Sequence, residues 1–293
     1  MQPPRQKKPR RRVSRQEQTA APLRPRNQPT PTTLTGNFRK HEAFTSKFLE
    51  SPRDMLVYLP PGYEEETERR YPVLYMHDGQ NLFDGATSFV PGQEWRVDET
   101  AEELIRGGAI EPLIIVAIYN TGESRLAEYT PTADDEHGGG QANLYGRLLI
   151  EELKPFIDER YRTLAGSQDT AIGGSSLGGL VSLYLGLRYP GEFGKLAVMS
   201  PAAWWDDQMI IRHVENLPER PESRIWLDIG TLEGRTAHRD ALGLRDALVG
   251  RGWKLGEDLA FLEEKDAPHS EAAWAHRVDP MLRFLFPEKR HLR

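Results

Sequence analysis

The sequence DTAIGGSSLGGLV, residues 169–181, decides the fold of this 293-residue chain. A short apolar run ends in two glycines, turns through two serines and leaves through two more glycines into an amphipathic segment. Residues 174–178 fit G-x-S-x-G, a sharp strand-to-helix turn that strains the central serine and requires small neighbours. The turn places the serine hydroxyl near a helix N-terminus, whose free N–H groups can stabilise an oxyanion. The pattern predicts that Ser176 is a nucleophile; the alternative is an ordinary tight turn.

The composition excludes several classes of protein for this chain, among them proteins with a membrane-spanning helix and disulfide-bonded proteins. Apolar residues make up 38% of the chain, and no apolar run approaches the roughly 20 residues that span a membrane. The N-terminal region lacks the apolar core of a secretory signal, so we expect a cytoplasmic protein that does not act at a membrane. The absence of cysteine excludes disulfides, thiol nucleophiles and thiolate metal sites. It fits a reducing compartment without excluding export.

Charge is unevenly distributed along the chain. Residues 1–30 hold nine Lys or Arg and one acidic residue, whereas the remainder holds 29 basic and 43 acidic residues. Residues 1–34 are rich in Arg, Pro and Gln, so we expect a disordered basic arm. The arm could contact nucleic acid or an acidic partner, but a solvated tail is the simpler interpretation. The acidic remainder argues against a nucleic-acid-binding body.

Apolar runs and helical periods alternate from about residue 36 onward. Strands are expected at residues 38–49, 53–59, 71–76, 112–118, 170–174, 195–199, 224–229 and 259–262. Helices are expected at residues 98–106, 144–161 with a kink or restart at Pro155, 177–189, 240–249 and 272–286 with an interruption near Pro280. Residues 120–142 read as a long polar loop.

This alternation predicts the fold class. Strands that alternate with helices form one mainly parallel, doubly wound sheet with right-handed crossovers and helices on both faces. We find no internal repeat and no second core, so the sequence predicts a single three-layer αβα domain over residues 35–290. The strand–turn–helix around Ser176 makes this an α/β-hydrolase fold.

A serine nucleophile needs a base to take its proton. Five histidines follow the turn, namely His213, His238, His269, His276 and His291. In the α/β-hydrolase order the histidine comes last, after the acid, on a loop that leaves a late strand. His269 lies between the last expected strand and the last expected helix, so we favour it as the base.

The base in turn needs an orienting carboxylate. Glu233 lies in the loop that follows the expected strand 224–229, where such an acid belongs. Asp228 lies within that strand and would have to be buried or at its rim. We prefer Glu233 and keep Asp228 as the alternative.

The oxyanion hole combines two backbone N–H groups. One is that of Leu177, directly after the nucleophile; the other comes from the loop after residues 71–76, so we expect Gly79 or Gln80 to donate. Residues 137–140, HGGG, match another oxyanion pattern, but they follow the wrong strand. We interpret them as a flexible or substrate-facing loop.

These residues, taken together, resemble the esterase family of α/β-hydrolases that includes enterochelin esterases, feruloyl and acetyl xylan esterases, S-formylglutathione hydrolase and mycolyltransferases. The similarity covers most of residues 36–287, and the combination of motifs is specific where no single motif is. Beside the turn, the motifs are VYLPPGY (57–63), YPVLY (71–75), DGQN (78–81), ELKPFI (152–157), SPA (200–202), GTLE (230–233) and HSEAAW (269–274).

The resemblance implies a role for each motif. It makes Ser176 the nucleophile and His269 the base, with the acid in residues 230–233. Residues 78–80 and 120–128 look most like the enterochelin-esterase branch, although the N-terminal β-domain of some of those enzymes is missing and the body is acidic. Arg125 either binds substrate or forms a surface ion pair with Glu128.

Two further residues are candidates for the substrate pocket. Trp204 and Trp205 follow the SPA motif and line an acyl or aromatic pocket, pack in the core or anchor the start of a helix. No His/carboxylate cluster has metal-ligand spacing, and a serine hydrolase needs neither metal nor cofactor.

The sequence thus predicts a cofactor-independent serine carboxylesterase that acts on a small-molecule ester through a Ser–His–acid triad. Siderophore trilactones and feruloyl or acetyl-sugar esters are candidate substrates. A non-catalytic binding protein on a hydrolase scaffold is the alternative of another class, since fold does not fix function. The sequence does not predict the oligomeric state.

Overall fold

An eight-stranded sheet forms the centre of the computed structural model, which describes residues 31–134 and 136–288. Its strand order is β1-β2-β4-β3-β7-β8-β9-β10. β2 pairs antiparallel with β1 and β4, and every neighbouring pair from β4 to β10 is parallel. The strands are β1 (Asn37–Phe44), β2 (Arg53–Leu59), β3 (Val73–Met76), β4 (Ile114–Ile118), β7 (Thr170–Ser175), β8 (Lys195–Met199), β9 (Arg224–Gly230) and β10 (Leu259–Glu264).

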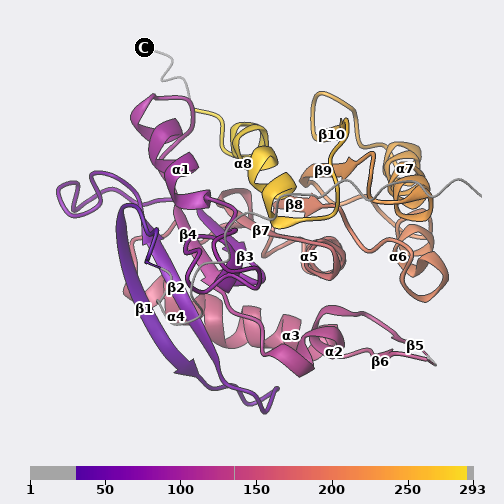
Figure 1. Cartoon of the computed structure of the whole chain (residues 1–293), viewed down its shortest axis with the longest axis horizontal. Helices are drawn as coiled ribbons and strands as arrows, with labels where there is room; N and C mark the ends of the chain where they lie inside the picture. Colours follow the sequence, from indigo (N-terminus) through magenta and orange to yellow (C-terminus); the bar gives the residue numbers. More distant parts are fainter. Residues whose placement is uncertain (1–30, 135, 289–293) are drawn as a thin grey trace, which may run out of the picture.

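Helices cover both faces of this sheet (Figure 1). One face carries α1 (Val97–Arg106) and α8 (Glu271–Leu285), which pack against each other. The other face carries α3 (Ala142–Arg147), α4 (Lys154–Arg160), α5 (Leu177–Arg188), α6 (Trp205–Glu215) and α7 (Arg235–Gly250). The predicted three-layer αβα architecture with a mainly parallel sheet is confirmed.

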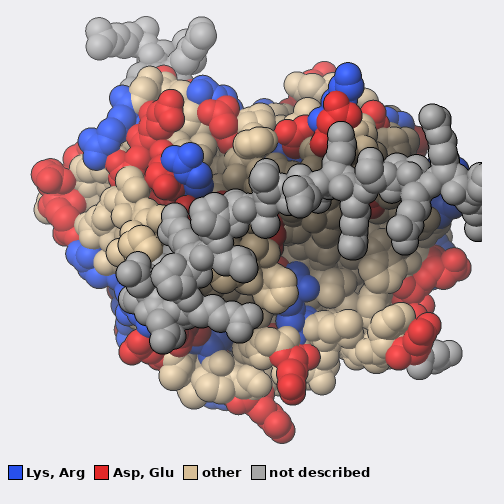
Figure 2. Space-filling view, in the orientation of Figure 1, with Lys and Arg blue, Asp and Glu red and all other residues tan. Residues whose placement is uncertain are grey.

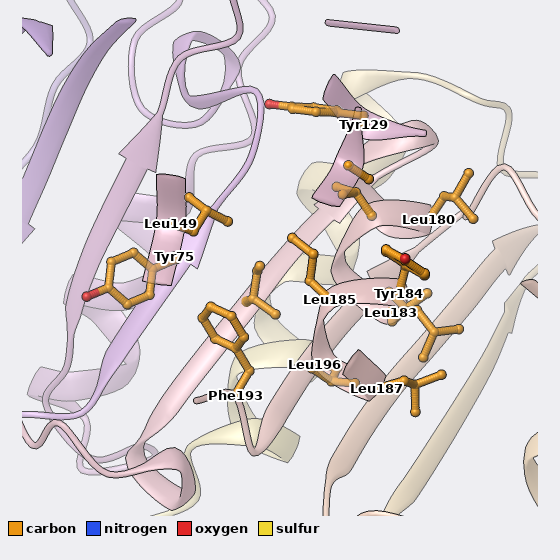
Figure 3. Packing of buried hydrophobic residues seen from close by; sticks show 14 of the residues in the cluster. Tyr75, Tyr129, Leu149, Leu180, Leu183, Tyr184, Leu185, Leu187, Phe193 and Leu196 are labelled. Atoms are coloured by element: carbon orange, nitrogen blue, oxygen red, sulfur yellow. The ribbon is translucent and has the colours of Figure 1, made fainter. Parts of the chain in front are cut away.

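The core has two halves, one on each side of the sheet. Side chains alternate along β2: Met55 and Val57 enter one half, Leu56 and Tyr58 the other. Figure 3 shows leucines of α5 packed with Phe193 and Leu196 in the first half. A Cβ placed on Gly186 would lie 2.2 Å from the Leu196 side chain, so α5 lies very close to β8. This contact fixes the helix that begins directly after Ser176.

Three local predictions need correction or refinement. Residues 120–142 are not one loop, because they contain a 3-10 helix (Gly122–Ser124), α2 (Arg125–Tyr129) and a hairpin of β5 (Ala133–Asp134) and β6 (Gly138–Gly139). The buried Tyr129 anchors this segment in the core. α8 runs through Pro280 without interruption, because its buried apolar side chains continue on both sides of the proline. At Pro155, where a kink or restart is expected, the backbone stays helical, and a π-helix (Leu148–Leu153) joins α3 to α4.

The N-terminal segment before β1 is tied to the body by two aspartates. Asp84 accepts hydrogen bonds from the Thr32 hydroxyl (3.0 Å) and the Thr33 N–H (3.2 Å), and Asp98 accepts one from the Thr35 N–H (2.7 Å). Burial, and then the neighbouring Glu99, raise the pKa of Asp98 to about 8. Residues 1–30 of the predicted arm lie outside the described part of the chain.

Asp98→Asn should make stability less dependent on pH. The folded-state pKa of Asp98 lies above its ordinary 3.8, so the folded protein retains a proton that the unfolded chain loses, and stability falls between pH 4 and about pH 8. Asn keeps the acceptor for Thr35 but cannot ionise. We expect its Tm to match the wild type at pH 4 and to exceed it by about 2–4 °C or more at pH 8. The exposed Asp246→Asn serves as control; a constant Tm difference across pH would contradict the assignment.

Candidate active site

Ser176 lies between the end of β7 and the start of α5, on the predicted strand–turn–helix. Its backbone has φ 57° and ψ −121°, a conformation that non-glycine residues rarely adopt. A Cβ placed on Gly174 would lie 3.1 Å from the Gly178 backbone, which explains the small residues on both sides of the serine. The Ser176 side chain is half-buried and reaches a surface pocket.

His269 and Glu233 lie together on loops that leave neighbouring parallel strands. His269 Nδ1 is 2.7 Å from Glu233 Oε2. The Glu233 side chain is fully buried, whereas the His269 side chain is 43% exposed. His269 lines the same pocket as Ser176. The structure therefore brings a serine, a histidine and an acid to the carboxyl edge of the sheet in the expected chain order.

Asp228 occupies a different environment from Glu233. It is fully buried within β9 and accepts hydrogen bonds from Arg277 Nη1 and Trp226 Nε1, both at 2.7 Å. Burial raises the pKa of Asp228 despite the charge of Arg277. Burial also acts to raise the pKa of Glu233, but hydrogen bonds from His269, Ser200 and the Gly230 N–H outweigh it and lower that pKa. Glu233 is thus the charged acid beside the histidine.

The pocket over Ser176 has a volume of about 470 Å³. Its walls come from the segments that follow β3, β4, β7 and β10. The lining residues are Asp78, Gln80, Asn81, Phe89, Asn120, Gly122, Arg125, Ser175, Ser176, His269, Glu271 and Trp274. A pocket of this size at the carboxyl ends of parallel strands suits a small organic ligand.

Gly79 and Gln80 begin a short 3-10 helix directly after β3. A Cβ on Gly79 would lie 2.6 Å from the Ala117 backbone, so only glycine allows this loop to lie against the end of β4. Gln80 lines the pocket, and its side chain accepts a hydrogen bond from the Asn120 N–H at 3.2 Å. Leu177 is the first residue of α5, where helical N–H groups have no partner within the helix.

Arg125 forms a bidentate ion pair with Asp78, with Nε and Nη2 at 2.7 and 2.6 Å from the two carboxylate oxygens. Asn120 Nδ2 donates to the same carboxylate at 2.7 Å. The surface pair of Arg125 with Glu128 is therefore wrong. Glu128 is buried and instead accepts two hydrogen bonds from Arg53, at 3.0 and 3.1 Å. Arg125 lines the pocket as part of a clamp on the loop that precedes Gly79.

Neither Trp204 nor Trp205 lines this pocket. Trp205 is buried, and its Nε1 donates to the Thr132 carbonyl at 3.2 Å; Trp204 is 45% exposed. A Cβ on Gly139 would lie 3.1 Å from the Trp205 ring, so the hairpin that contains the HGGG residues packs on Trp205. The core-packing alternative fits Trp205, and residues 137–140 also lie outside the pocket lining.

The other candidate histidines are elsewhere. His238 Nε2 is 2.8 Å from Glu263, His213 packs against the Tyr184 ring and the His276 side chain is 77% exposed. None of these three lines the pocket over Ser176. His291 lies outside the described residues.

Sequence reasoning assigned no role to Trp274, Phe89 or Asn120. The Trp274 ring meets His269 edge to face with centroids 4.8 Å apart. The sequence could have indicated the position of Trp274 near His269. Ser270 caps α8, so residue 274 lies in the first helical turn after the histidine. Asn120 follows the carboxyl end of β4, a position that also signals a site. Nothing in the sequence distinguishes Phe89, which is 81% exposed at the rim.

The described residues limit other kinds of site. Over residues 31–134 and 136–288, no group of three or more His, Asp or Glu side chains is arranged to hold a metal ion. Within the same ranges, no helix has the length and apolarity to cross a membrane.

Figure 2 shows the surface charge on the face of the molecule that is drawn in Figure 1. Acidic and basic side chains are interspersed on this face.

Comparison with known proteins identifies a matching family and several related sequences. The family described as "Putative esterase" matches residues 46–285. The YbbA protein of Bacillus subtilis (strain 168) is 27% identical over 270 residues, which cover 88% of this chain and 99% of YbbA. The ferri-bacillibactin esterase BesA of the same strain is 30% identical over 216 residues, 67% of this chain and 68% of BesA.

A solved structure supports the fold independently. The enterobactin esterase FES from Shigella flexneri, in the presence of enterobactin, aligns with a TM-score of 0.71 at 20% identity over 90% of this chain and 62% of that chain. The chain belongs to the esterase family that matches it, and it is a carboxylic ester hydrolase with the α/β-hydrolase fold.

Proposed function

We propose that this chain hydrolyses esters through a Ser176–His269–Glu233 triad and a covalent acyl-enzyme. The observation that carries the proposal is the 2.7 Å contact between Glu233 Oε2 and Nδ1 of His269, which lines the same pocket as the strained Ser176. A carboxylate at Nδ1 holds the imidazole in the tautomer whose Nε2 is free to accept a proton.

The reaction has two halves. Ser176 Oγ attacks the ester carbonyl while His269 Nε2 takes its proton, and Glu233 stabilises the imidazolium that forms. The N–H groups of Leu177 and of Gly79 or Gln80 stabilise the oxyanion. His269 then protonates the leaving alcohol, and water, activated by the same imidazole, releases the acid and regenerates Ser176.

The pocket lining suggests which esters to test. Phe89 and Trp274 present aromatic surfaces beside Ser176, whereas Arg125 and Asn120 offer polar groups. This combination suits an ester that carries a hydroxylated aromatic ring, as a catecholate siderophore trilactone or a feruloyl ester does. The name of BesA favours the siderophore class. Relative kcat/KM for nitrophenyl, feruloyl, acetyl-sugar and trilactone esters separates these classes.

Ser176→Ala should abolish turnover of a short-chain nitrophenyl ester, with a fall in kcat of at least about 10⁴-fold. A fluorophosphonate probe should label the wild type and leave Ser176→Ala unlabelled. Ser175→Ala, one residue earlier at the end of β7, is the matched control and should be labelled. Folded wild-type protein that resists the probe would favour a non-catalytic binding role.

Glu233→Gln should mainly slow catalysis, whereas Asp228→Asn should mainly lower the stability of the fold. Glu233→Gln lets the side-chain amide donate to His269 Nδ1 and stabilises the wrong tautomer, so kcat/KM should fall by about 10³–10⁴-fold. Asp228→Asn removes one of the three carboxylates that pair with the buried Arg277 and should lower stability by up to about 3–5 kcal/mol, with a smaller loss of kcat per folded molecule. A larger rate loss for folded Asp228→Asn would make Asp228 the orienting acid instead.

A further inference from the structure

Glu233 uses its two carboxylate oxygens for different partners. Oε2 contacts His269 Nδ1. Oε1 accepts hydrogen bonds from the Ser200 hydroxyl at 2.6 Å, from the Gly230 N–H at 2.7 Å and from Arg277 Nη1 and Nη2 at 3.3 Å. The carboxylate is therefore held on one side by donors that do not belong to the triad.

The hydroxyl of Ser200 has only one orientation open to it. Trp274 Nε1 and Arg277 Nη1 lie 3.0 and 2.8 Å from Ser200 Oγ, and both groups can only donate. They fill the two acceptor positions of the hydroxyl. Its single proton must then point to Glu233 Oε1, the only acceptor in reach among the contacts of Ser200 Oγ in the described structure. This arrangement requires an unprotonated Oε1.

The donors around Ser200 are themselves fixed. Arg277 is fully buried on α8, donates to Asp228 at 2.7 Å and also pairs with Glu264 through Nε. The Ser200 N–H donates to Asp228 Oδ1 at 3.1 Å, and Ser200 has the strained φ of 40°. Asp228 thus holds both Arg277 and the backbone of Ser200.

We propose that Ser200 is a positioning residue of the active site, which acts through Glu233. Its hydroxyl fixes the rotation of the Glu233 carboxylate so that Oε2 remains directed at His269 Nδ1. Ser200 touches neither the nucleophile nor the base in the contacts of the described structure, and Arg277 and Trp274 orient its hydroxyl. The inference rests on the proposed triad.

Ser200→Ala tests this role. Removal of the hydroxyl leaves Trp274 Nε1 without its acceptor. Oε1 of Glu233 then keeps only the Gly230 N–H and the longer Arg277 contacts, so the carboxylate is held less firmly. We expect kcat to fall roughly 10- to 100-fold with KM within about twofold. Ser200→Gly also lacks the hydroxyl and suits the positive φ, and it should lose as much kcat; it replaces the alanine variant if that variant does not fold. Ser182→Ala, which removes a buried hydroxyl bonded to the Gly178 carbonyl, is the control and should keep wild-type kcat.

Two readouts separate positioning from a structural role. In Ser200→Ala, the low-field ¹H NMR signal of the His269 Nδ1–H should shift or broaden, while it stays in place in Ser182→Ala. The double variant Ser200→Ala/Glu233→Gln should be no slower than Glu233→Gln alone, because Ser200 acts only through Glu233. Additive losses would instead mean an independent structural effect.

The outcomes also distinguish this inference from the proposed function. Full kcat and an unchanged NMR signal in Ser200→Ala and Ser200→Gly, with Ser176→Ala and Glu233→Gln inactive, would overturn the role of Ser200 alone. Full activity in Ser176→Ala would overturn the proposed triad itself.

Discussion

One buried guanidinium, that of Arg277, connects helix α8 with the neighbouring strands β9 and β10. It comes from α8 and reaches Asp228 on β9, Glu233 on the loop after β9 and Glu264 at the end of β10. Removal of one partner from a buried ion pair costs about 3–5 kcal/mol, so the arrangement of α8, β9 and β10 that pairs Arg277 is favoured over one that leaves it unpaired. That same arrangement directs one oxygen of Glu233 at His269.

Backbone strain concentrates next to this network. Ser176 and Ser200 both have positive φ, and they follow the neighbouring strands β7 and β8. The Ser176 N–H donates to the Met199 carbonyl and the Ala202 N–H to the Ser176 carbonyl, so the two strained turns support each other. The packing of α5 on β8 maintains these conformations, since strain of this kind persists only where the surrounding structure over-determines it.

The sequence predicts those parts of the fold and site that depend on local patterns. β2 and β8 have the bounds that the sequence predicts, because a strand covered on both faces reads as a nearly continuous apolar segment. Ser176, Glu233 and His269 could be selected because strand ends and turn residues mark them. Arg277 could not: it stands between His276 and Asp279 in what reads as an ordinary polar helix face, and only the tertiary structure buries it. Arg125 was given the wrong partner for the same reason, since Asp78 lies 47 residues away in the sequence.

The central claim is a covalent intermediate on Ser176, held in the geometry that Glu233 and His269 provide. Its most direct test is the intact mass of the enzyme, quenched in acid during turnover of a slowly deacylated aromatic ester, followed by peptide mapping. The account predicts one added acyl group per chain, on the peptide that contains residues 174–178. Turnover without any adduct under conditions where deacylation limits the rate, or an adduct on another residue, would contradict it.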